Sequence, residues 1–228
     1  MILELYKPIG ITTVEFIEQY KKETKCKKIC FAGRLDPLAH GKLCVLTDED
    51  VYRKDEFCGC DKIYESYIIK NITTDTYDIM GIPSISYKEE QEIPKKIMQK
   101  YPPYSSVMIT KHRKPYWFVT KMNLQMEEKD IPTKEVEIHS IEKVDEKKIS
   151  SKEIFDIVNN RISKVNEKQN FRQTEILEKW KEILTDNEEQ LTVIKVRVKC
   201  SSGTYIRNIG NMLNGCCFDI CRIEYIKN

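Results

Sequence analysis

The chain has no long hydrophobic run, few histidines and no glycine-rich phosphate loop. None of its apolar stretches approaches the length needed to cross a bilayer, and the first residues lack the pattern of a secretory leader. Neither a Walker loop nor a dinucleotide fingerprint occurs, and only three histidines are available as metal ligands. We therefore expect a cytoplasmic protein, with nucleus and mitochondrion as open alternatives, that has no membrane segment.

The nine cysteines do not follow a disulfide or metal-binding pattern. Cys58 and Cys60 lack a second matching pair, and Cys26 and Cys30 are too far apart for a zinc knuckle. Without a secretory signal, cysteines are usually reduced and behave as small core residues. We expect no structural disulfide and no metal.

Composition indicates a globular chain without a dominant charge. The 228 residues are 40% hydrophobic and 32% charged, and 38 basic against 36 acidic residues give a net charge of +2. Any nucleic-acid surface must therefore arise from local arrangement. Basic clusters occur at residues 21–28 and 111–114, and each is interpreted either as a solvated face or as a phosphate contact.

One short loop surrounds a carboxylate with residues that disfavour regular structure. Asp36 lies in the segment Gly33-Arg34-Leu35-Asp36-Pro37-Leu38-Ala39-His40-Gly41. Its glycines and proline predict a tight loop, which can hold one acidic side chain as a nucleophile or orienting group. Taken alone, the segment favours an Asp-Pro turn without chemistry.

Four further motifs accompany this loop along the chain. They are Tyr6-Lys7-Pro8-Ile9-Gly10-Ile11-Thr12-Thr13, Ile63-Tyr64-Glu65 leading to Thr74-Asp75-Thr76-Tyr77-Asp78, Pro102-Pro103-Tyr104-Ser105, and Ser201-Ser202-Gly203-Thr204-Tyr205-Ile206-Arg207. In this order and spacing, the set resembles the TruB family of pseudouridine synthases, whose members isomerise a uridine in the T-loop of tRNA. The resemblance extends from about Leu3 to Ile223, and the insertion before the last motif is more similar to the eukaryotic, Pus4-like branch.

The resemblance implies a role for each matching residue. Asp36 corresponds to the carboxylate that attacks the ribose or the base or supports a glycal, and Arg207 to the arginine that pairs with it. Tyr64 corresponds to the tyrosine that stacks on the base and is placed for proton transfer. Further substrate-binding residues are expected at Tyr205, Ile220, Phe31, Lys7 and Arg34. The implied partner is tRNA, bound by a monomer that needs no cofactor.

The chain departs from the family pattern at several positions. Phe31 stands where a histidine often enters the RNA loop, His40 replaces a small hydroxyl residue, and Met108 replaces a lysine. The small C-terminal RNA-binding domain of bacterial relatives is expected to be missing. Two alternatives follow: an RNA-binding chaperone with little or no activity, or the same chemistry on messenger or ribosomal RNA.

The resemblance and the apolar patterns together predict an α/β (α+β) fold, a mixed and mostly antiparallel sheet flanked by helices, in one catalytic domain over residues 1–228. Strands are predicted at residues 2–5, 42–46, 63–72, 135–144, 194–200 and 218–226. Helices are predicted after a capping box at Thr12 and Glu15, at residues 92–100, and at 205–213 after Thr204 as its N-cap. A charged insertion at about 145–190 should hold two amphipathic helices, with a capping box at Ser150. The aromatic run Tyr116-Trp117-Phe118 is predicted as a strand, packed in the core or stacked on RNA.

Overall fold

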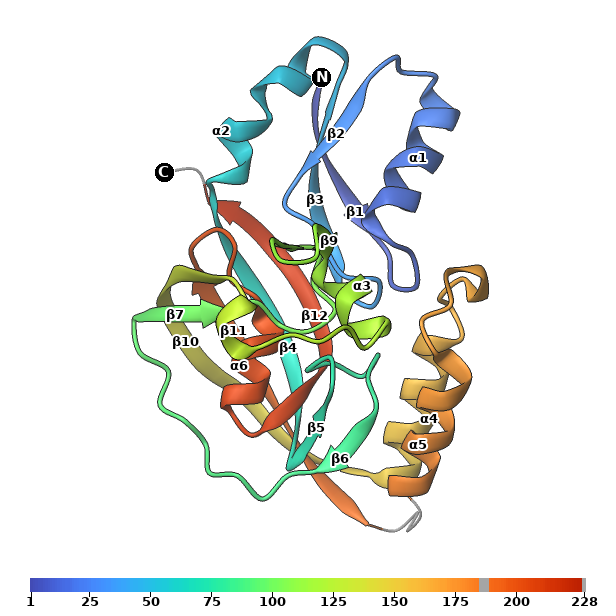
Figure 1. Ribbon diagram of the computed structural model, residues 1–228, viewed down its shortest axis with the longest axis vertical. Coiled ribbons are helices and arrows are strands. Elements are labelled where there is room, and N and C mark those ends of the chain that lie inside the picture. Colours follow the sequence, from blue (N-terminus) through green and yellow to red (C-terminus); the bar gives the residue numbers. More distant parts are fainter. Residues whose placement is uncertain (185–188, 227–228) are drawn as a thin grey trace.

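The computed structural model describes residues 1–184 and 189–226. Its main feature is one mixed sheet with the strand order β1-β3-β12-β4-β11-β10-β7, in which β2 pairs with β3 (Figure 1). Its strands are β1 (Ile2–Lys7), β2 (Ile29–Ala32), β3 (His40–Thr47), β4 (Asp61–Lys70), β7 (Lys96–Lys100), β10 (Thr133–Ser150), β11 (Gln190–Cys200) and β12 (Gly215–Ile226). All these pairings are antiparallel except the short parallel contact of β12 with β3, so the predicted sheet is confirmed.

Helices and two small hairpins surround this sheet (Figure 1). The hairpins pair β5 (Ile72–Thr74) with β6 (Pro83–Ile85), and β8 (Met108–Ile109) with β9 (Lys114–Pro115). The helices are α1 (Thr13–Thr24), α2 (Lys54–Cys58), α3 (Tyr116–Lys121), α4 (Ser151–Ile162), α5 (Gln173–Ile183) and α6 (Ile206–Met212), with 3₁₀ turns at Asp48–Arg53, Glu128–Asp130 and Glu167–Gln169. None of the described helices is both long and apolar enough to cross a membrane. None of the nine cysteines, all of which lie in the described part of the chain, forms a disulfide.

The central strands follow the alternation of their sequence. In β11, Val196, Val198 and Cys200 are buried, whereas Arg197 between them is exposed. β11 pairs on one side with β4 and on the other with β10. The predicted strand at 194–200 is thus confirmed and lies in the middle of the sheet.

Helix α1 begins as its capping box predicts. The Thr12 side chain accepts a hydrogen bond from the Glu15 backbone N–H, and the Glu15 carboxylate accepts one from the Thr12 N–H. Ile17 is buried against Leu43 and Val45 of β3. The start of α1 is therefore fixed close to the loop that carries Asp36.

The insertion consists of two helices that pack side by side on the core (Figure 1). Ser150 caps α4, and most of the apolar positions of both helices are buried in one cluster with Ile69, Ile79 and Phe218, while Leu177 and Ile183 are partly buried against it. Residues 145–150 of the predicted insertion belong to β10, Gln190 begins β11, and residues 185–188 lie outside the described part of the chain.

Three local predictions are wrong. Residues 96–100 of the predicted helix form β7, because Ile97 pairs across the sheet with Val136 of β10. The run from Tyr116 forms α3, where Tyr116 and Val119 share one buried helical face, so the strand prediction fails there. Tyr205 caps α6, and the Thr204 hydroxyl instead donates to the Ser201 carbonyl.

Candidate active site

The site is built on an ion pair between Asp36 and Arg207. Asp36 lies in the loop between β2 and β3, and Arg207 is the second residue of α6. The Arg207 Nε lies 2.8 Å from the Asp36 Oδ2. The arginine side chain is 3% exposed and the aspartate side chain is 32% exposed, so the carboxylate is the accessible member of the pair. Sequence analysis predicted this pairing, and the structure brings the two side chains together.

Arg207 is held on the protein side by further acceptors. Its Nη1 donates to the Thr76 carbonyl at 2.7 Å and to the Pro103 carbonyl at 3.4 Å. Its Nε lies 3.7 Å from the Asp78 Oδ2. Burial lowers the pKa of Arg207, but the two carboxylates more than offset this and raise it above its usual value. One charged side chain therefore links its own motif to three of the other four.

Asp78 is a site residue that sequence analysis did not identify. Its carboxylate accepts hydrogen bonds from the Thr76 hydroxyl at 2.7 Å and from the Met80 N–H at 3.0 Å. Burial raises the pKa of Asp78 to about 6, with Asp36 adding to the rise and Arg207 opposing it. Asp78 could have been identified from the sequence, because it belongs to the Thr74–Asp78 motif. A carboxylate in one motif is a candidate partner for an arginine in another.

Lys7 supports the Asp36 loop and lines neither of the two cavities described below. Its side chain is fully buried, and its Nζ donates to the carbonyls of Pro8, Ile11 and Pro37 at 2.8, 2.7 and 3.3 Å. Burial lowers the pKa of Lys7 to about 8. Lys7, which was predicted to bind substrate, thus holds the Pro37 carbonyl next to Asp36 in place.

Thr13 fixes the same loop from α1. Its hydroxyl donates to the Leu35 carbonyl at 2.8 Å and accepts from the Leu35 N–H at 3.0 Å. The Gly10 N–H donates to the Pro37 carbonyl at 2.9 Å. The residues on both sides of Asp36 are therefore anchored, which presents its carboxylate in one place.

A cavity of about 280 Å³ lies beside the ion pair. Its lining includes the predicted residues Asp36, Tyr64, Arg207, Tyr205, Ile220 and Arg34. Two tyrosine side chains and one isoleucine supply flat and apolar walls. The charged residues of the lining are Asp36 and four cations, Arg34, Lys62, Arg207 and Arg222. The structure thus brings six of the eight predicted site residues to one cavity.

Both tyrosines of this cavity are phenols rather than phenolates at neutral pH. Burial raises the pKa of Tyr64, with Arg222 opposing the rise, and burial raises the pKa of Tyr205 to about 12. Arg222 stands opposite Tyr64 in the β12–β4 register and lines the same cavity. It donates to the Gly33 carbonyl at 3.0 Å and to the Lys42 carbonyl at 2.7 Å. Sequence analysis missed Arg222, for which the chain carries no local signal.

Phe31 does not reach the cavity. It lies half-buried on β2, packed beside Leu43 and Val45, with the Arg34 guanidinium 5.6 Å and the Lys54 ammonium 5.8 Å from its ring centroid. Arg34 itself is exposed and lines the cavity. Arg34 therefore faces the cavity, whereas Phe31 lies under the Arg34 guanidinium.

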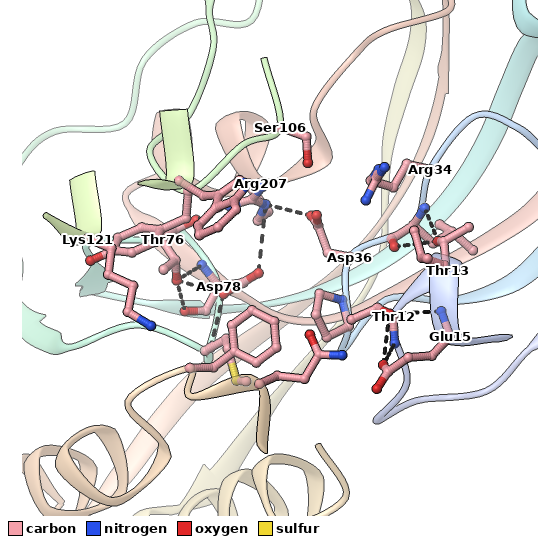
Figure 2. A pocket seen from close by; sticks show the side chains of 18 of the residues that line it. Thr12, Thr13, Glu15, Arg34, Asp36, Thr76, Asp78, Ser106, Lys121 and Arg207 are labelled. Atoms are coloured by element: carbon pink, nitrogen blue, oxygen red, sulfur yellow. Dashed lines mark hydrogen bonds and ion pairs between the residues drawn. The ribbon is translucent and has the colours of Figure 1, made fainter. Parts of the chain in front are cut away.

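A second cavity, of about 380 Å³, is shown in Figure 2. It shares a wall with the first. Both are lined by Arg34, Leu35, Asp36, Ser106 and Arg207. The second is also lined by α1, by Trp117 and Lys121 of α3, and by residues 169–172 of the insertion. Of the predicted aromatic run, Tyr116 is thus a core residue, whereas Trp117 is 42% exposed at this cavity. Among the described residues, no cluster of three potential ligands could hold a metal ion.

Comparison with known proteins gives a consistent family and fold. The model of the TruB family pseudouridylate synthase N-terminal domain matches residues 21–150. A tRNA pseudouridine synthase B of Mesoplasma florum is 33% identical over 211 residues, which cover 91% of this chain and 60% of the relative. The corresponding protein of Aquifex aeolicus is 33% identical over 125 residues, covering 50% of this chain and 43% of the relative. The chain thus spans less than two thirds of the length of these relatives.

Solved structures with the same fold include chains of two complexes. A chain of an H/ACA RNP bound to a substrate RNA containing 2′-deoxyuridine aligns with a TM-score of 0.52 at 15% identity, over 98% of this chain and 47% of that chain. A chain of a Cbf5-Nop10-Gar1 complex aligns with a TM-score of 0.53 at 16% identity, over 98% of this chain and 48% of that chain. The predicted pseudouridine synthase fold is confirmed, and the similarity of the insertion to the eukaryotic branch stays a prediction.

Proposed function

Because the chain belongs to the TruB family of pseudouridylate synthases, we propose that it isomerises uridine to pseudouridine in tRNA, at the T-loop. The observation that carries the proposal is the ion pair of Asp36 and Arg207, 2.8 Å apart, in the wall of a cavity that also contains Tyr64. The similarity to bacterial tRNA pseudouridine synthases B supports tRNA as the substrate class.

The reaction rearranges one nucleoside without a second substrate. The bond from ribose C1′ to base N1 breaks, the detached base turns, and C1′ forms a bond to C5. The proton on C5 leaves and N1 gains a proton, so the product has the same atoms as the uridine. The protein therefore has to supply a carboxylate, a proton relay and a closed pocket that retains the free base.

Asp36 is the group proposed to act on the nucleoside. Its carboxylate either bonds to C1′ or to the base, or it takes a proton from the ribose to give a glycal. Arg207 stays protonated at any physiological pH and bonds on its other edge to backbone carbonyls, so it fixes the orientation of Asp36. The accessible aspartate and the buried arginine fit this division of roles.

Tyr64 and its neighbours are proposed to hold the base. A uracil ring between the Tyr64 ring and the Ile220 side chain would have an apolar surface on both faces, with the Tyr205 ring at its edge. A phenol that burial keeps neutral can donate a hydrogen bond to the detached base and pass on its proton. Arg34, exposed at the mouth, would bind a phosphate and help to offset the few kcal/mol needed to unstack the base.

The test is site-resolved mapping of pseudouridine in unmodified tRNA incubated with the wild-type chain, Asp36→Asn or Asp55→Asn, without added cofactor or metal. Asp55 is an exposed acid of α2 and serves as the matched control. We expect one new pseudouridine in the T-loop with the wild type and the control, and none with Asp36→Asn. Tight tRNA binding without isomerisation at any uridine would refute the enzyme and favour an RNA chaperone.

A second comparison defines the substrate class. Isolated T-arm stem–loops and unrelated stem–loops of equal length, each with a central uridine, are offered to the wild-type chain. Preference for the T-arm supports tRNA, whereas equal modification of all loops would point to messenger or ribosomal RNA.

A further inference from the structure

Arg172 lies in the charged insertion, outside the five sequence motifs, yet its side chain contacts residues of two of them. We propose that Arg172 is a positioning residue for the active site, which acts by holding the two loops whose carbonyl groups orient Arg207. Its expected effect on catalysis rests on the proposed function, because that function makes the pair of Asp36 and Arg207 the reacting centre.

Arg172 holds the loop that follows β5 by an ion pair. Its Nη2 lies 2.9 Å from the Asp75 Oδ2, and the Oδ1 of the same carboxylate accepts a hydrogen bond from the Ile82 N–H at 2.8 Å. The next residue, Thr76, provides the carbonyl that accepts a hydrogen bond from the Arg207 Nη1 at 2.7 Å. One acceptor of Arg207 therefore directly follows the residue that Arg172 binds.

Arg172 holds the loop between β7 and β8 through an aromatic ring. Its guanidinium lies 4.6 Å from the ring centroid of Tyr104, within the range of a cation–π contact. The preceding residue, Pro103, provides the second carbonyl that accepts from the Arg207 Nη1, at 3.4 Å. One guanidinium of the insertion thus contacts the chain neighbours of both carbonyls.

The insertion also holds the first of these loops at its other end. Trp180 of α5 is fully buried, and its indole N–H donates to the Ile79 carbonyl at 3.2 Å. Ile79 directly follows Asp78, the second carboxylate of the site. The loop from Asp75 to Asp78 is therefore held between Arg172 and Trp180, both of which belong to the insertion.

The backbone of Arg172 indicates that its side-chain contacts, and not helix formation, select its conformation. Arg172 is the N-cap residue of α5 with a left-handed φ of 64°, and its side chain forms no capping hydrogen bond with any described residue. N-cap residues usually have an extended backbone and a short polar side chain. A left-handed conformation is unfavourable for a residue with a Cβ atom and persists only where its surroundings fix it. The contacts with Asp75 and Tyr104 supply such a fixing interaction.

A positioning role can be distinguished from a role in folding. The Arg172 side chain is 22% exposed and that of Asp75 is 38% exposed, and ion pairs this accessible to solvent contribute little to the free energy of unfolding. Catalysis is more sensitive, because misplacement of a reacting group by about 1 Å can lower the rate about 100-fold. Loss of Arg172 should therefore reduce the rate much more than the stability.

The first test is the kinetics of pseudouridine formation in tRNA by the wild-type chain, Arg172→Gln, Arg172→Lys and Arg53→Gln. We expect Arg172→Gln to lower kcat about 10-fold with little change in KM, and Arg172→Lys to recover part of this loss, because an ammonium can still pair with Asp75. Arg53 forms an exposed ion pair with Glu56 and is the matched control. A raised KM with an unchanged kcat would mean that Arg172 binds RNA directly, and would overturn the proposal.

A double-mutant cycle assigns the effect to the ion pair. Asp75→Asn removes the charge but keeps an acceptor for the Ile82 N–H, and it should lower kcat by a factor similar to that of Arg172→Gln. The combined variant should be little slower than either single variant, because both substitutions remove the same contact. Losses that multiply would contradict the proposal. If Arg172→Gln does not fold, Asp75→Asn and Tyr104→Leu provide the same comparison.

A spectroscopic measurement that needs no activity separates the positioning role from the proposed function. The ¹⁵N-edited NMR signal of the Arg207 Nε–H, assigned by its absence in Arg207→Lys, should shift in Arg172→Gln and stay in place in Arg53→Gln. A shifted signal in a chain that forms no pseudouridine would support the positioning role and remove the activity. An active wild type, with signal and kcat unchanged in Arg172→Gln, would remove the positioning role and leave the proposed function intact.

Discussion

Arg207 engages a second carboxylate besides that of Asp36, because its Nε lies 3.7 Å from the Asp78 Oδ2. The Asp78 side chain is 10% exposed, whereas that of Asp36 is 32% exposed. Asp78 therefore holds the arginine from the buried side and leaves Asp36 facing the cavity. Two carboxylates in different environments around one cation can take different roles.

Replacing Asp78 by asparagine should lower kcat about 10- to 100-fold with little change in KM, because Arg207 loses one of the groups that orient it. The pKa of Asp78 is raised to about 6, so its charge is present above this pH and lost below it. We expect the wild-type kcat to fall as the pH drops through about 6. In Asp78→Asn this inflection should be absent.

The measurement is pseudouridine formation at saturating tRNA between about pH 5 and 8, the range in which Asp78 changes charge. Asp55→Asn, the exposed acid of α2, is the control and should keep the wild-type profile. A wild-type rate and an unchanged inflection in Asp78→Asn would show that Asp78 does not act on the site.

Arg207→Lys should reduce kcat about 100-fold although the positive charge is kept. The guanidinium faces Asp36 through Nε and donates to the Thr76 carbonyl through Nη1. A lysine ammonium cannot span both groups in the same geometry. Rate measurement is combined with circular dichroism, which should show an unchanged fold.

Arg197 offers a matched substitution for this experiment. Its Nη2 lies 2.6 Å from the Glu65 Oε1 on the exposed side of the sheet, so Arg197→Lys should be almost silent, as exposed ion pairs contribute little. Equal losses in both variants would mean that the effect is not specific to the site.

Tyr64 is expected to contribute through its ring and its hydroxyl separately. Tyr64→Phe keeps the flat surface, so KM should stay near the wild-type value while kcat falls about 10-fold through loss of the proton donor. Tyr64→Ala should raise KM as well, since stacking of one base contributes about 1–3 kcal/mol. Tyr52→Phe, at a tyrosine that is 72% exposed, is the control. A normal kcat in Tyr64→Phe would exclude a role for the hydroxyl.

Local sequence patterns predicted those parts of the fold that depend on neighbouring residues. The capping box of α1, the Ser150 cap of α4, the alternation in β11 and the helical spacing of Ile154, Val158 and Ile162 were sufficient to place their elements. β7 could not be predicted this way, because its strand conformation depends on pairing with β10, far along the chain. The sheet order likewise depends on contacts between distant segments.

In the site, too, some features could be predicted from the sequence and others depend on contacts between distant residues. The motifs predicted that Asp36 and Arg207 would meet, but burial decides what each remaining group can do. Lys7 has a charged side chain in a matching motif, yet its ammonium is buried and bonded to carbonyls. Arg222 became visible only through the register that places it opposite Tyr64.

A cluster at the junction of the insertion and the sheet gives a further pH effect. The His40 Nε2 lies 3.2 Å from Asp219, whose Oδ1 is 2.5 Å from the Arg161 Nη1, and the Tyr6 hydroxyl is 2.5 Å from the His40 Nδ1. Hydrogen bonding to Asp219 and to Cys221 raises the pKa of His40 from 6.5 to about 10. The folded protein therefore keeps a proton on this ring that the unfolded chain loses near neutral pH.

The stability of the protein should consequently fall as the pH rises above neutrality. A histidine with a raised pKa contributes its stabilisation fully below the unfolded value of 6.5 and loses it as the pH approaches about 10. Between pH 6.5 and 8 this loss amounts to about 1.5 kcal/mol in the free energy of unfolding, measured by urea titration at several pH values. His40→Gln should be less stable at pH 6.5 and should lack this slope, whereas His112→Gln, at a ring that contacts the neutral Gln125 carbonyl, should retain it. A slope that persists unchanged in His40→Gln would mean that the proton is bound elsewhere, and that the junction between insertion and sheet does not depend on the charge of His40.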